Sequence, residues 1–220
     1  MHANIDPTNV SSLQRGARNF MNYCSGCHSA KYVRYSRVAD DLGIPEDMLK
    51  KNLMFTSERV HDTIKVAMPT ADAAVWFGKA PPDLSLVARS RGADWLYGFL
   101  KTYYLEEFSP TGVNNLTFPN TGMPHVLWEL QGWQRPVFHP VEGADGERRD
   151  ELVGVEPIGD GLLNPDEYDV FVRDLVNFLD YLGEPVKAKR TRLGVKVIAF
   201  LLVFTLLAWA LKREYWKDIK

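Results

Sequence analysis

The feature that most constrains this fold is an apolar run near the C-terminus. Residues 197–211 read VIAFLLVFTLLAWAL without a charge, and residues 193–195 extend the run to nineteen if Lys196 is tolerated. A bilayer span needs about 20 apolar residues, so fifteen alone would also suit a buried core helix. The run has no polar face, and basic clusters and aromatic residues bracket it, which is typical of a membrane interface. We therefore predict one transmembrane helix over residues 193–211.

Charge divides the chain at the same place. Residues 187–220 hold nine basic and two acidic residues, a net charge of +7, whereas residues 1–186 hold 17 basic and 26 acidic residues, a net charge of −9. An acidic body argues against nucleic acid as a partner, because phosphate binding requires clustered Lys and Arg. We expect a body over 1–186, a basic linker over 187–192, the membrane helix over 193–211 and a tail over 212–220.

Both cysteines of the chain lie in one pentapeptide, Cys24-Ser25-Gly26-Cys27-His28. Cys-x-x-Cys-His is the attachment signature of c-type haem, in which two thiols bind the porphyrin and the histidine binds the iron. A zinc site would need about four ligands, and there is no second cysteine pair. A redox dithiol would not need the adjacent histidine, and a structural disulfide would leave His28 without a role. The pattern predicts one covalent haem c, with His28 as a ligand of its iron.

This chemistry also predicts the topology. Basic residues flank the apolar run on both sides, so the positive-inside rule does not orient it. Haem of this type is attached outside the bacterial cytoplasm, which places the body in the periplasm and residues 212–220 in the cytoplasm, with one pass through the inner membrane. Residues 1–23 contain no apolar signal core, so we expect that a signal peptide has been cleaved.

Sequence periodicity predicts the elements around the haem motif. Leu13, Ala17, Phe20 and Cys24 recur at helical spacing, and Ser11 or Ser12 can cap such a helix. A second helix is expected over residues 57–66. Asn164-Pro165-Asp166-Glu167 is a typical helix start, and residues 136–161 read as a surface hairpin or insertion around a turn at 143–146.

The sixth ligand of the iron has several candidates. Two of them, Met68 and Met123, precede proline, which disfavours helical backbone and fixes the residue on a loop. Met68 follows the expected helix, so packing is its simpler role, whereas Met123 lies in an irregular stretch that can present a thioether. The residues alone favour Met123 and leave Met68 or a histidine open. The other candidates are His2, His61, His125, His139, Met21, Met48 and Met54.

Several motifs in this order resemble the cytochrome c1 family, the haem subunits of the ubiquinol–cytochrome c reductase (cytochrome bc1 complex), and most closely its proteobacterial type. They extend over nearly the whole chain. The motifs are Cys24-Ser25-Gly26-Cys27-His28-Ser29, Tyr32 and Tyr35, Ala80-Pro81-Pro82-Asp83-Leu84-Ser85, Arg89 and Arg91, Gly122-Met123-Pro124, and the basic C-terminal end Lys212-Arg213-Glu214-Tyr215-Trp216-Lys217.

The resemblance implies a mainly α fold, a class I c-type cytochrome-like haem domain with long loop insertions plus one C-terminal transmembrane helix. It implies Met123 as the sixth ligand, Pro82 in the lining of the haem crevice and Arg91 near a haem propionate. It also implies an electron-transfer subunit rather than an enzyme. Its partners would be cytochrome b, the Rieske iron–sulfur protein and a periplasmic cytochrome c, within a dimeric complex. The alternatives are a free-standing membrane-anchored c-type cytochrome and a haem enzyme with an open iron position.

Overall fold

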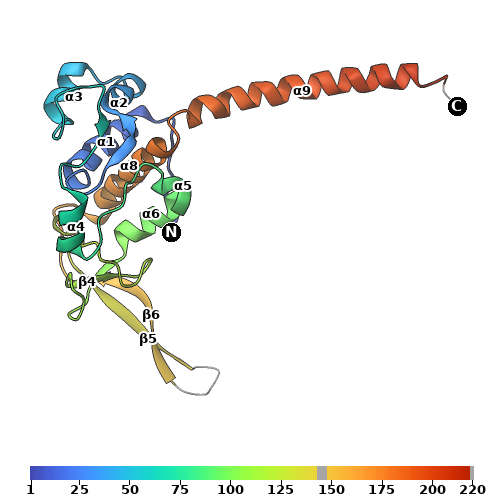
Figure 1. Cartoon of the computed structure of the whole chain (residues 1–220). Coiled ribbons are helices and arrows are strands. Elements are labelled where there is room, and N and C mark those ends of the chain that lie inside the picture. Colours follow the sequence, from blue (N-terminus) through green and yellow to red (C-terminus); the bar gives the residue numbers. More distant parts are fainter. Residues whose placement is uncertain (143–147, 219–220) are drawn as a thin grey trace. The chain divides into compact units, whose positions relative to one another are not determined.

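The computed structural model describes residues 1–142 and 148–218, in two units, Met1–Gly183 and Glu184–Lys220 (Figure 1). Helices dominate the described residues, which confirms the mainly α class. The helices are α1 (Val10–Tyr23), α2 (Tyr35–Leu42), α3 (Glu46–Asn52), α4 (Thr70–Phe77), α5 (Val87–Arg91), α6 (Ala93–Lys101), α7 (Trp128–Gln131), α8 (Pro165–Gly183) and α9 (Lys187–Tyr215). The strands pair in antiparallel couples: β1 (Ala30–Arg34) with β2 (Thr63–Ile64), β3 (Tyr103–Leu105) with β4 (Val113–Asn115), and β5 (Gln134–Glu142) with β6 (Arg148–Pro157).

The core of the first unit is built on α1 and α8, which lie side by side (Figure 1). Gly16 on α1 lets the helices approach closely, because a Cβ there would lie 2.1 Å from the carbonyl oxygen of Asp174. Arg15 donates to the Asp174 carboxylate at 2.5 Å, and the rings of Phe20 and Phe178 are 5.7 Å apart. The helix that leads into the two cysteines is therefore fixed against a helix about 150 residues later in the chain.

The start of α8 confirms the prediction made from its sequence. The backbone N–H groups of Asp166 and Glu167 donate to Asn164 Oδ1, both at 3.0 Å. Glu167 Oε2 in turn accepts the N–H of Asn164 at 3.0 Å. These reciprocal bonds form a capping box, which satisfies donors that the first helical turn leaves without partners.

The cap of α1 differs from the prediction. The helix begins at Val10, and Asn9 rather than Ser11 or Ser12 caps it, with Asn9 Oδ1 accepting the N–H of Ser12 at 3.1 Å. Asparagine is as good a cap as serine. Because the helix begins at Val10, both serines fall inside its first turn.

The prediction of a helix over residues 57–66 is wrong. This stretch forms turns followed by β2, which pairs with β1. Ser57 Oγ donates to Asp62 Oδ2 at 2.6 Å, and Arg59 donates to the same oxygen at 3.3 Å. Short polar side chains that bond locally compete with helical backbone hydrogen bonds, and here they prevail over the apolar spacing.

The hairpin expected within residues 136–161 is confirmed. Strands β5 and β6 pair from Gln134 with Pro157 to Glu142 with Arg148, with one register shift at Val137/Phe138. The turn predicted at residues 143–146 lies outside the described residues. Gly132 and Gly161 pack tightly at the base, since a Cβ on Gly161 would lie 2.2 Å from the Leu130 carbonyl oxygen.

The second unit is the long apolar helix α9. It spans 29 residues, none of them buried, with a mean hydropathy of 2.3 in its most apolar window. At about 1.5 Å per residue it is roughly 43 Å long, more than the ~30 Å hydrocarbon core of a bilayer requires. Residues 187–192, expected to be a linker, continue this helix. Within residues 1–142 and 148–218, α9 is thus the one helix long and apolar enough to act as a membrane anchor.

Candidate haem site

The Cys24–His28 segment forms a compact turn at the C-terminal end of α1. The N–H groups of Cys24 and Ser25 donate to the Phe20 carbonyl at 2.9 and 3.0 Å, and those of Cys27 and His28 donate to the Cys24 carbonyl at 3.1 and 2.8 Å. Ser25 Oγ donates to a backbone carbonyl of the last helical turn at 2.7 Å. The local bonds thus hold two thiols and one imidazole within a single turn.

The two thiols are not joined in a disulfide. Burial, reinforced by the neighbouring Cys27, raises the pKa of the Cys24 thiol to about 12, so Cys24 is a neutral thiol at pH 7. A low-pKa redox dithiol would need an environment that stabilises the thiolate, which is the opposite of this one. In the parts of the chain that the structure describes, no group of three His, Cys, Asp or Glu is arranged to hold a metal ion.

His28 is buried and its tautomer is defined by one contact. Its Nδ1 lies 2.7 Å from the Pro82 carbonyl oxygen. A carbonyl only accepts, so Nδ1 carries the hydrogen and Nε2 carries the lone pair. Burial lowers the pKa of His28, and the Pro82 hydrogen bond and the Asp83 charge oppose this only partly. A neutral imidazole with an oriented second nitrogen is the form that binds metals.

The segment that supplies this carbonyl is bonded directly to the chain after His28. Leu84 N–H donates to the Ser29 carbonyl at 2.8 Å. The N–H of Lys31 donates to Asp83 Oδ2 at 3.0 Å, and the N–H of Tyr32 donates to Ser85 Oγ at 3.2 Å. These bonds hold residues 82–85 against residues 29–32, and they explain why Pro82 faces the imidazole.

The Met123 loop is ordered by side chains on its N-terminal side. The N–H of Asn120 donates to Asn114 Oδ1 at 2.7 Å, and the N–H of Met123 donates to Thr121 Oγ1 at 3.3 Å. Met123 itself is half-buried. None of the contacts described above joins it to His28, so its assignment as a ligand stays a prediction.

The other candidates for a sixth ligand fall into distinct environments. Met21 and Met54 are buried in the core, and Met68 is half-buried before the proline that caps α4. Exposed positions hold His2, which contacts Asp94, together with Met48, His61 and His139. His125 is buried between aromatic rings.

Arg91 ends α5 and is held by aromatic rings. Its guanidinium carbon lies 4.9 Å from the centre of the Trp95 ring and 5.6 Å from that of Phe118. Within the described part of the chain it makes no ion pair with a carboxylate. Ring contacts of this kind orient a guanidinium and leave its N–H groups available for an anion.

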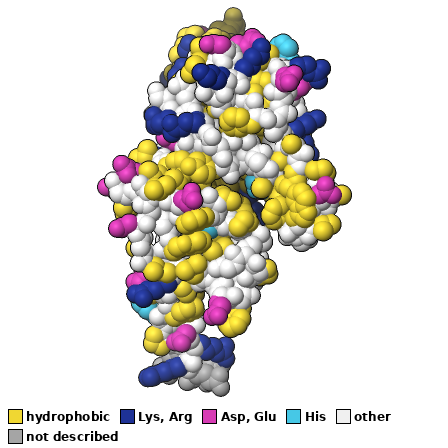
Figure 2. All heavy atoms as spheres, turned by 90° about the vertical axis from the view of Figure 1, so that its left-hand side faces the viewer, with side chains coloured by type: hydrophobic (Ala, Val, Ile, Leu, Met, Phe, Trp, Pro, Cys, Tyr) yellow, Lys and Arg dark blue, Asp and Glu magenta, His cyan; other side chains and the backbone are white. Residues whose placement is uncertain are grey.

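Exposed apolar side chains gather on the side of the first unit where α4 lies. Val75 and Trp76 on α4 are 82% and 64% exposed, and Phe77 and Phe118 are also exposed. Figure 2, which views the side where α4 lies in Figure 1, shows hydrophobic side chains over much of this face. A Cβ on Gly122 would lie 4.0 Å from the Phe77 carbonyl, so the Met123 loop passes the end of α4.

These residues fit a covalently bound haem. They offer two thiols in one turn, a neutral imidazole with its second nitrogen available, an oriented guanidinium and an uncovered apolar surface. Each property matches one part of the group: the vinyl carbons, the iron, a propionate and the porphyrin face.

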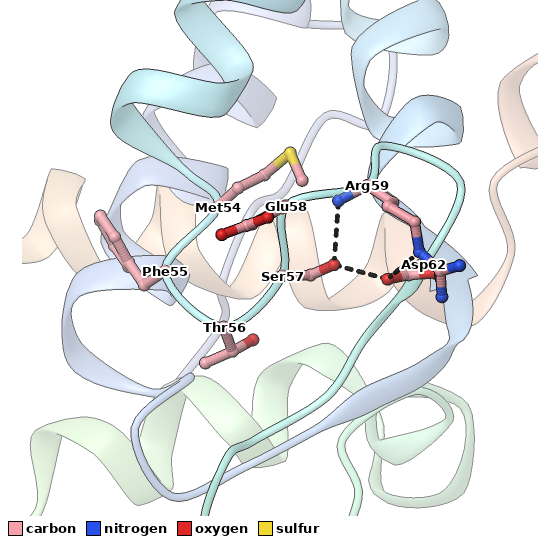
Figure 3. Close-up of a pocket in the computed structure, with 7 residues that line it drawn as sticks. All are labelled: Met54, Phe55, Thr56, Ser57, Glu58, Arg59 and Asp62. Carbon is pink, nitrogen blue, oxygen red and sulfur yellow. Dashed lines mark hydrogen bonds and ion pairs between the residues drawn. The ribbon is translucent and has the colours of Figure 1, made fainter.

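A separate open pocket follows α3. Its lining is Met54, Phe55, Thr56, Ser57, Glu58, Arg59 and Asp62 (Figure 3). Its polar groups bond mainly to one another, as the Ser57–Asp62–Arg59 contacts show. Met54 is its one contribution from the candidates for the sixth ligand, and its lining includes none of Cys24, Cys27, His28, Pro82, Arg91 and Met123, so it is not part of the candidate haem site.

Sequence reasoning missed two features that the structure shows. It assigned Pro82 to the haem crevice by resemblance but did not predict that its carbonyl fixes the His28 tautomer. It treated His125 only as one candidate ligand among many and did not predict its burial between aromatic rings. The proximity of His125 to Met123 in the sequence was the available signal.

Comparison with known proteins identifies the family of this chain. The profile of the Cytochrome C1 family matches residues 3–131 and 158–219. Cytochrome c1 of Allochromatium vinosum is 51% identical, with 99% of this chain and 88% of that protein covered. The ammonia monooxygenase gamma subunit of Nitrosomonas europaea is 45% identical (99% and 87%), and cytochrome c1 of Rhodospirillum rubrum is 30% identical (94% and 82%). This chain belongs to the cytochrome c1 family.

Proposed function

We propose that this chain binds one haem c through Cys24 and Cys27 and transfers single electrons within the respiratory quinol–cytochrome c reductase. Family membership supports electron transfer in that complex. The observation that carries the haem assignment is the hydrogen bond from His28 Nδ1 to the Pro82 carbonyl at 2.7 Å. It leaves Nε2 as the only ring nitrogen able to bind iron, in a residue adjacent to both thiols.

The protein's own residues would divide the work of holding the group. Cys24 and Cys27 would form the two thioether bonds, His28 and Met123 would occupy the axial positions, and Arg91 would pair with a propionate. When bound, haem c supplies a one-electron redox centre, and a thioether ligand favours the ferrous state and raises the potential. With His28 and Met123 both bound to the iron, exogenous ligands would be excluded from it.

We assign the chain the role of an electron-transfer subunit that is not an enzyme by itself. Electrons would arrive from the Rieske iron–sulfur protein and leave for a periplasmic cytochrome c, with cytochrome b as a further partner in a dimeric complex. The −9 charge of residues 1–186 supports a basic acceptor, since opposite charge accelerates association.

The proposed topology places residues 1–186 in the periplasm and residues 212–220 in the cytoplasm. Residues 193–211 would cross the inner membrane once. Residues 187–192 would continue the helix to the outer surface, because α9 begins at Lys187. The orientation rests on haem attachment outside the cytoplasm, whereas the single apolar helix supports the anchor itself.

Replacing the proposed axial thioether tests this function. Met123→Leu should retain covalent haem, lose the thioether-to-iron charge-transfer band and lower the reduction potential. Met68→Leu is the matched control and should leave both unchanged. An unaltered band and potential in Met123→Leu would remove Met123 from the site.

The wild type and Met123→Leu also test the alternative function, a haem enzyme with an open iron position. That alternative has one observation in its favour, the name of the relative from Nitrosomonas europaea, an ammonia monooxygenase subunit. An oxygenase or peroxidase site needs a vacant coordination position. We expect the reduced wild-type protein to bind carbon monoxide poorly and Met123→Leu to bind it readily. Ready binding by the wild type would favour the enzyme.

A further inference from the structure

His125 occupies an unusual place two residues after Met123. It is 5% exposed, and neither ring nitrogen has a hydrogen-bond partner among the residues that the structure describes. Its ring stacks on Tyr103, with centroids 4.7 Å apart and planes 3° from parallel. The Trp133 ring contacts the His125 ring in a T-shaped arrangement, with centroids 6.2 Å apart and planes at 74°. Aromatic packing holds the ring, and a polar influence on it comes from the Gln131 side chain, which opposes the lowering of the His125 pKa by burial.

A buried imidazole whose nitrogens make no hydrogen bond of normal geometry gives little stability advantage over phenylalanine. Leaving a buried polar group unsatisfied costs about 1–3 kcal/mol, whereas an apolar side chain of similar shape avoids that cost. Aromatic pairs, in contrast, contribute through ring area and geometry. The property of His125 that can stabilise this part of the fold is therefore the packing of its planar ring.

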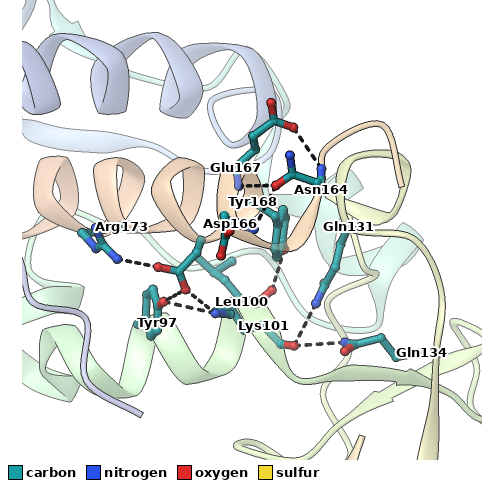
Figure 4. Close-up of polar contacts among 11 residues, drawn as sticks. Tyr97, Leu100, Lys101, Gln131, Gln134, Asn164, Asp166, Glu167, Tyr168 and Arg173 are labelled. Atoms are coloured by element: carbon teal, nitrogen blue, oxygen red, sulfur yellow. Dashed lines mark hydrogen bonds and ion pairs between the residues drawn. The ribbon is translucent and has the colours of Figure 1, made fainter. Parts of the chain in front are cut away.

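The residues around this ring are fixed to the backbone of the first unit. Gln134 Nε2 donates to the Tyr103 carbonyl at 2.7 Å and to the Lys101 carbonyl at 3.0 Å. Gln131 Nε2 donates to the same Lys101 carbonyl at 2.9 Å, and Figure 4 shows both glutamines converging on it. Tyr103 and the segment carrying Trp133 are thus linked, and the ring between them has little freedom to shift.

His125 anchors the C-terminal side of the Met123 loop, opposite the Thr121 contact. Only Pro124 separates it from Met123, and proline restricts the backbone on both sides. Gly122 and Pro124 are exposed, so neither buries a side chain that could hold the thioether. The two fixed points of this short loop are therefore the buried Thr121 and the buried His125.

We propose that His125 is a positioning residue for Met123, acting through the packing of its ring between Tyr103 and Trp133. The inference rests on the proposed role of Met123 as an axial ligand. It predicts that ring packing, and not the ring nitrogens, holds the thioether in place.

Two substitutions in the full-length, haem-loaded protein separate ring from nitrogen. His125→Ala removes the ring and should weaken the charge-transfer band and raise the affinity of the reduced protein for carbon monoxide by about tenfold or more, a change of only about 1.4 kcal/mol. His125→Phe should retain the band and the low affinity of the wild type. Phe171→Ala, a truncated ring on α8, is the control for general loosening and should leave both readouts unchanged.

The outcomes are decisive in each case. If Met123→Leu loses the band but His125→Ala keeps it, with unchanged carbon monoxide affinity, the positioning role is overturned and the proposed function stands. If His125→Phe behaves like His125→Ala, the nitrogens matter and ring packing is the wrong explanation. If the wild type itself has no such band, the ligand assignment fails first and the inference falls with it.

If His125→Ala fails to fold, Trp133→Leu provides the same test, because it removes the half-buried ring that packs against His125. It should weaken the band and raise carbon monoxide affinity in the same direction. Retention of wild-type values in Trp133→Leu would overturn the proposal.

Discussion

Gly16 should be the position where the smallest substitution does the most damage to the site. An added Cβ would lie 2.1 Å from the Asp174 carbonyl oxygen and 2.7 Å from Phe178 Cβ, where ordinary contacts are about 3.5–4.0 Å. One of the two obstructing atoms is backbone and the other begins a buried side chain, so α1 and α8 must separate by about 1 Å. Gly16→Ala tests this packing.

The expected decrease in the free energy of unfolding of Gly16→Ala follows from two opposing effects. Overpacking of this kind costs about 1–3 kcal/mol, and the close backbone contact places Gly16→Ala at or above the upper end. Alanine is favoured over glycine within a helix by about 0.5–1 kcal/mol. The net loss should be about 2 kcal/mol, which lowers the melting temperature by about 4–8 °C in a chain of this size.

The measurement is thermal unfolding of the full chain in detergent, followed by circular dichroism. Gly154→Ala is the matched control, because nothing lies within 4 Å of its Cβ position, and it should change stability by less than about 0.5 kcal/mol. If Gly16→Ala melts at or above the wild-type temperature, helix propensity prevails and the close packing of α1 on α8 is refuted.

Two further predictions concern an ion-pair network and the anchor. The pKa of Asp169 is lowered because contacts from Lys101, Tyr97 and Arg173 outweigh its burial. Asp169→Asn should therefore cost about 1–3 kcal/mol at pH 7. That difference should shrink as the pH falls below the unfolded pKa of about 3.9 and through the folded one, and a melting-temperature gap that stays constant from pH 6 to pH 2.5 would contradict it. Removing residues 192–220 should release a soluble, haem-loaded body, and a body that still sediments with membranes would disprove the single anchor.

Local features of the site could be predicted from the sequence because their chemistry is encoded within a few residues. The Cys24–His28 turn closes on itself and on the last turn of α1, and the cap at Asn164 is complete within four residues. The apolar run of α9 needs no tertiary partner to be recognised. In each case the determining contacts are short in sequence.

Features that depend on distant partners could not be predicted in the same way. The His28–Pro82 bond joins residues 54 apart, and no local spacing encodes which carbonyl will face an imidazole. The burial of His125 depends on β3 and on the segment before β5 meeting around it. The helix expected over residues 57–66 failed for a related reason, since pairing of Ile64 with β1 and the Ser57–Asp62 bond outweigh a helical apolar spacing.

The candidate site therefore depends on two segments of the chain, the Cys24–His28 turn and residues 82–85. The turn supplies the reactive groups, but a free imidazole could place its hydrogen on either nitrogen and rotate about its side-chain bonds. The Pro82 carbonyl removes that freedom, and residues 82–85 hold it there through bonds to residues 29–32. Because these contacts use protein atoms alone, the ring is oriented before any ligand is required. The orientation of the proposed iron ligand His28 thus depends on a loop that the pentapeptide does not contain.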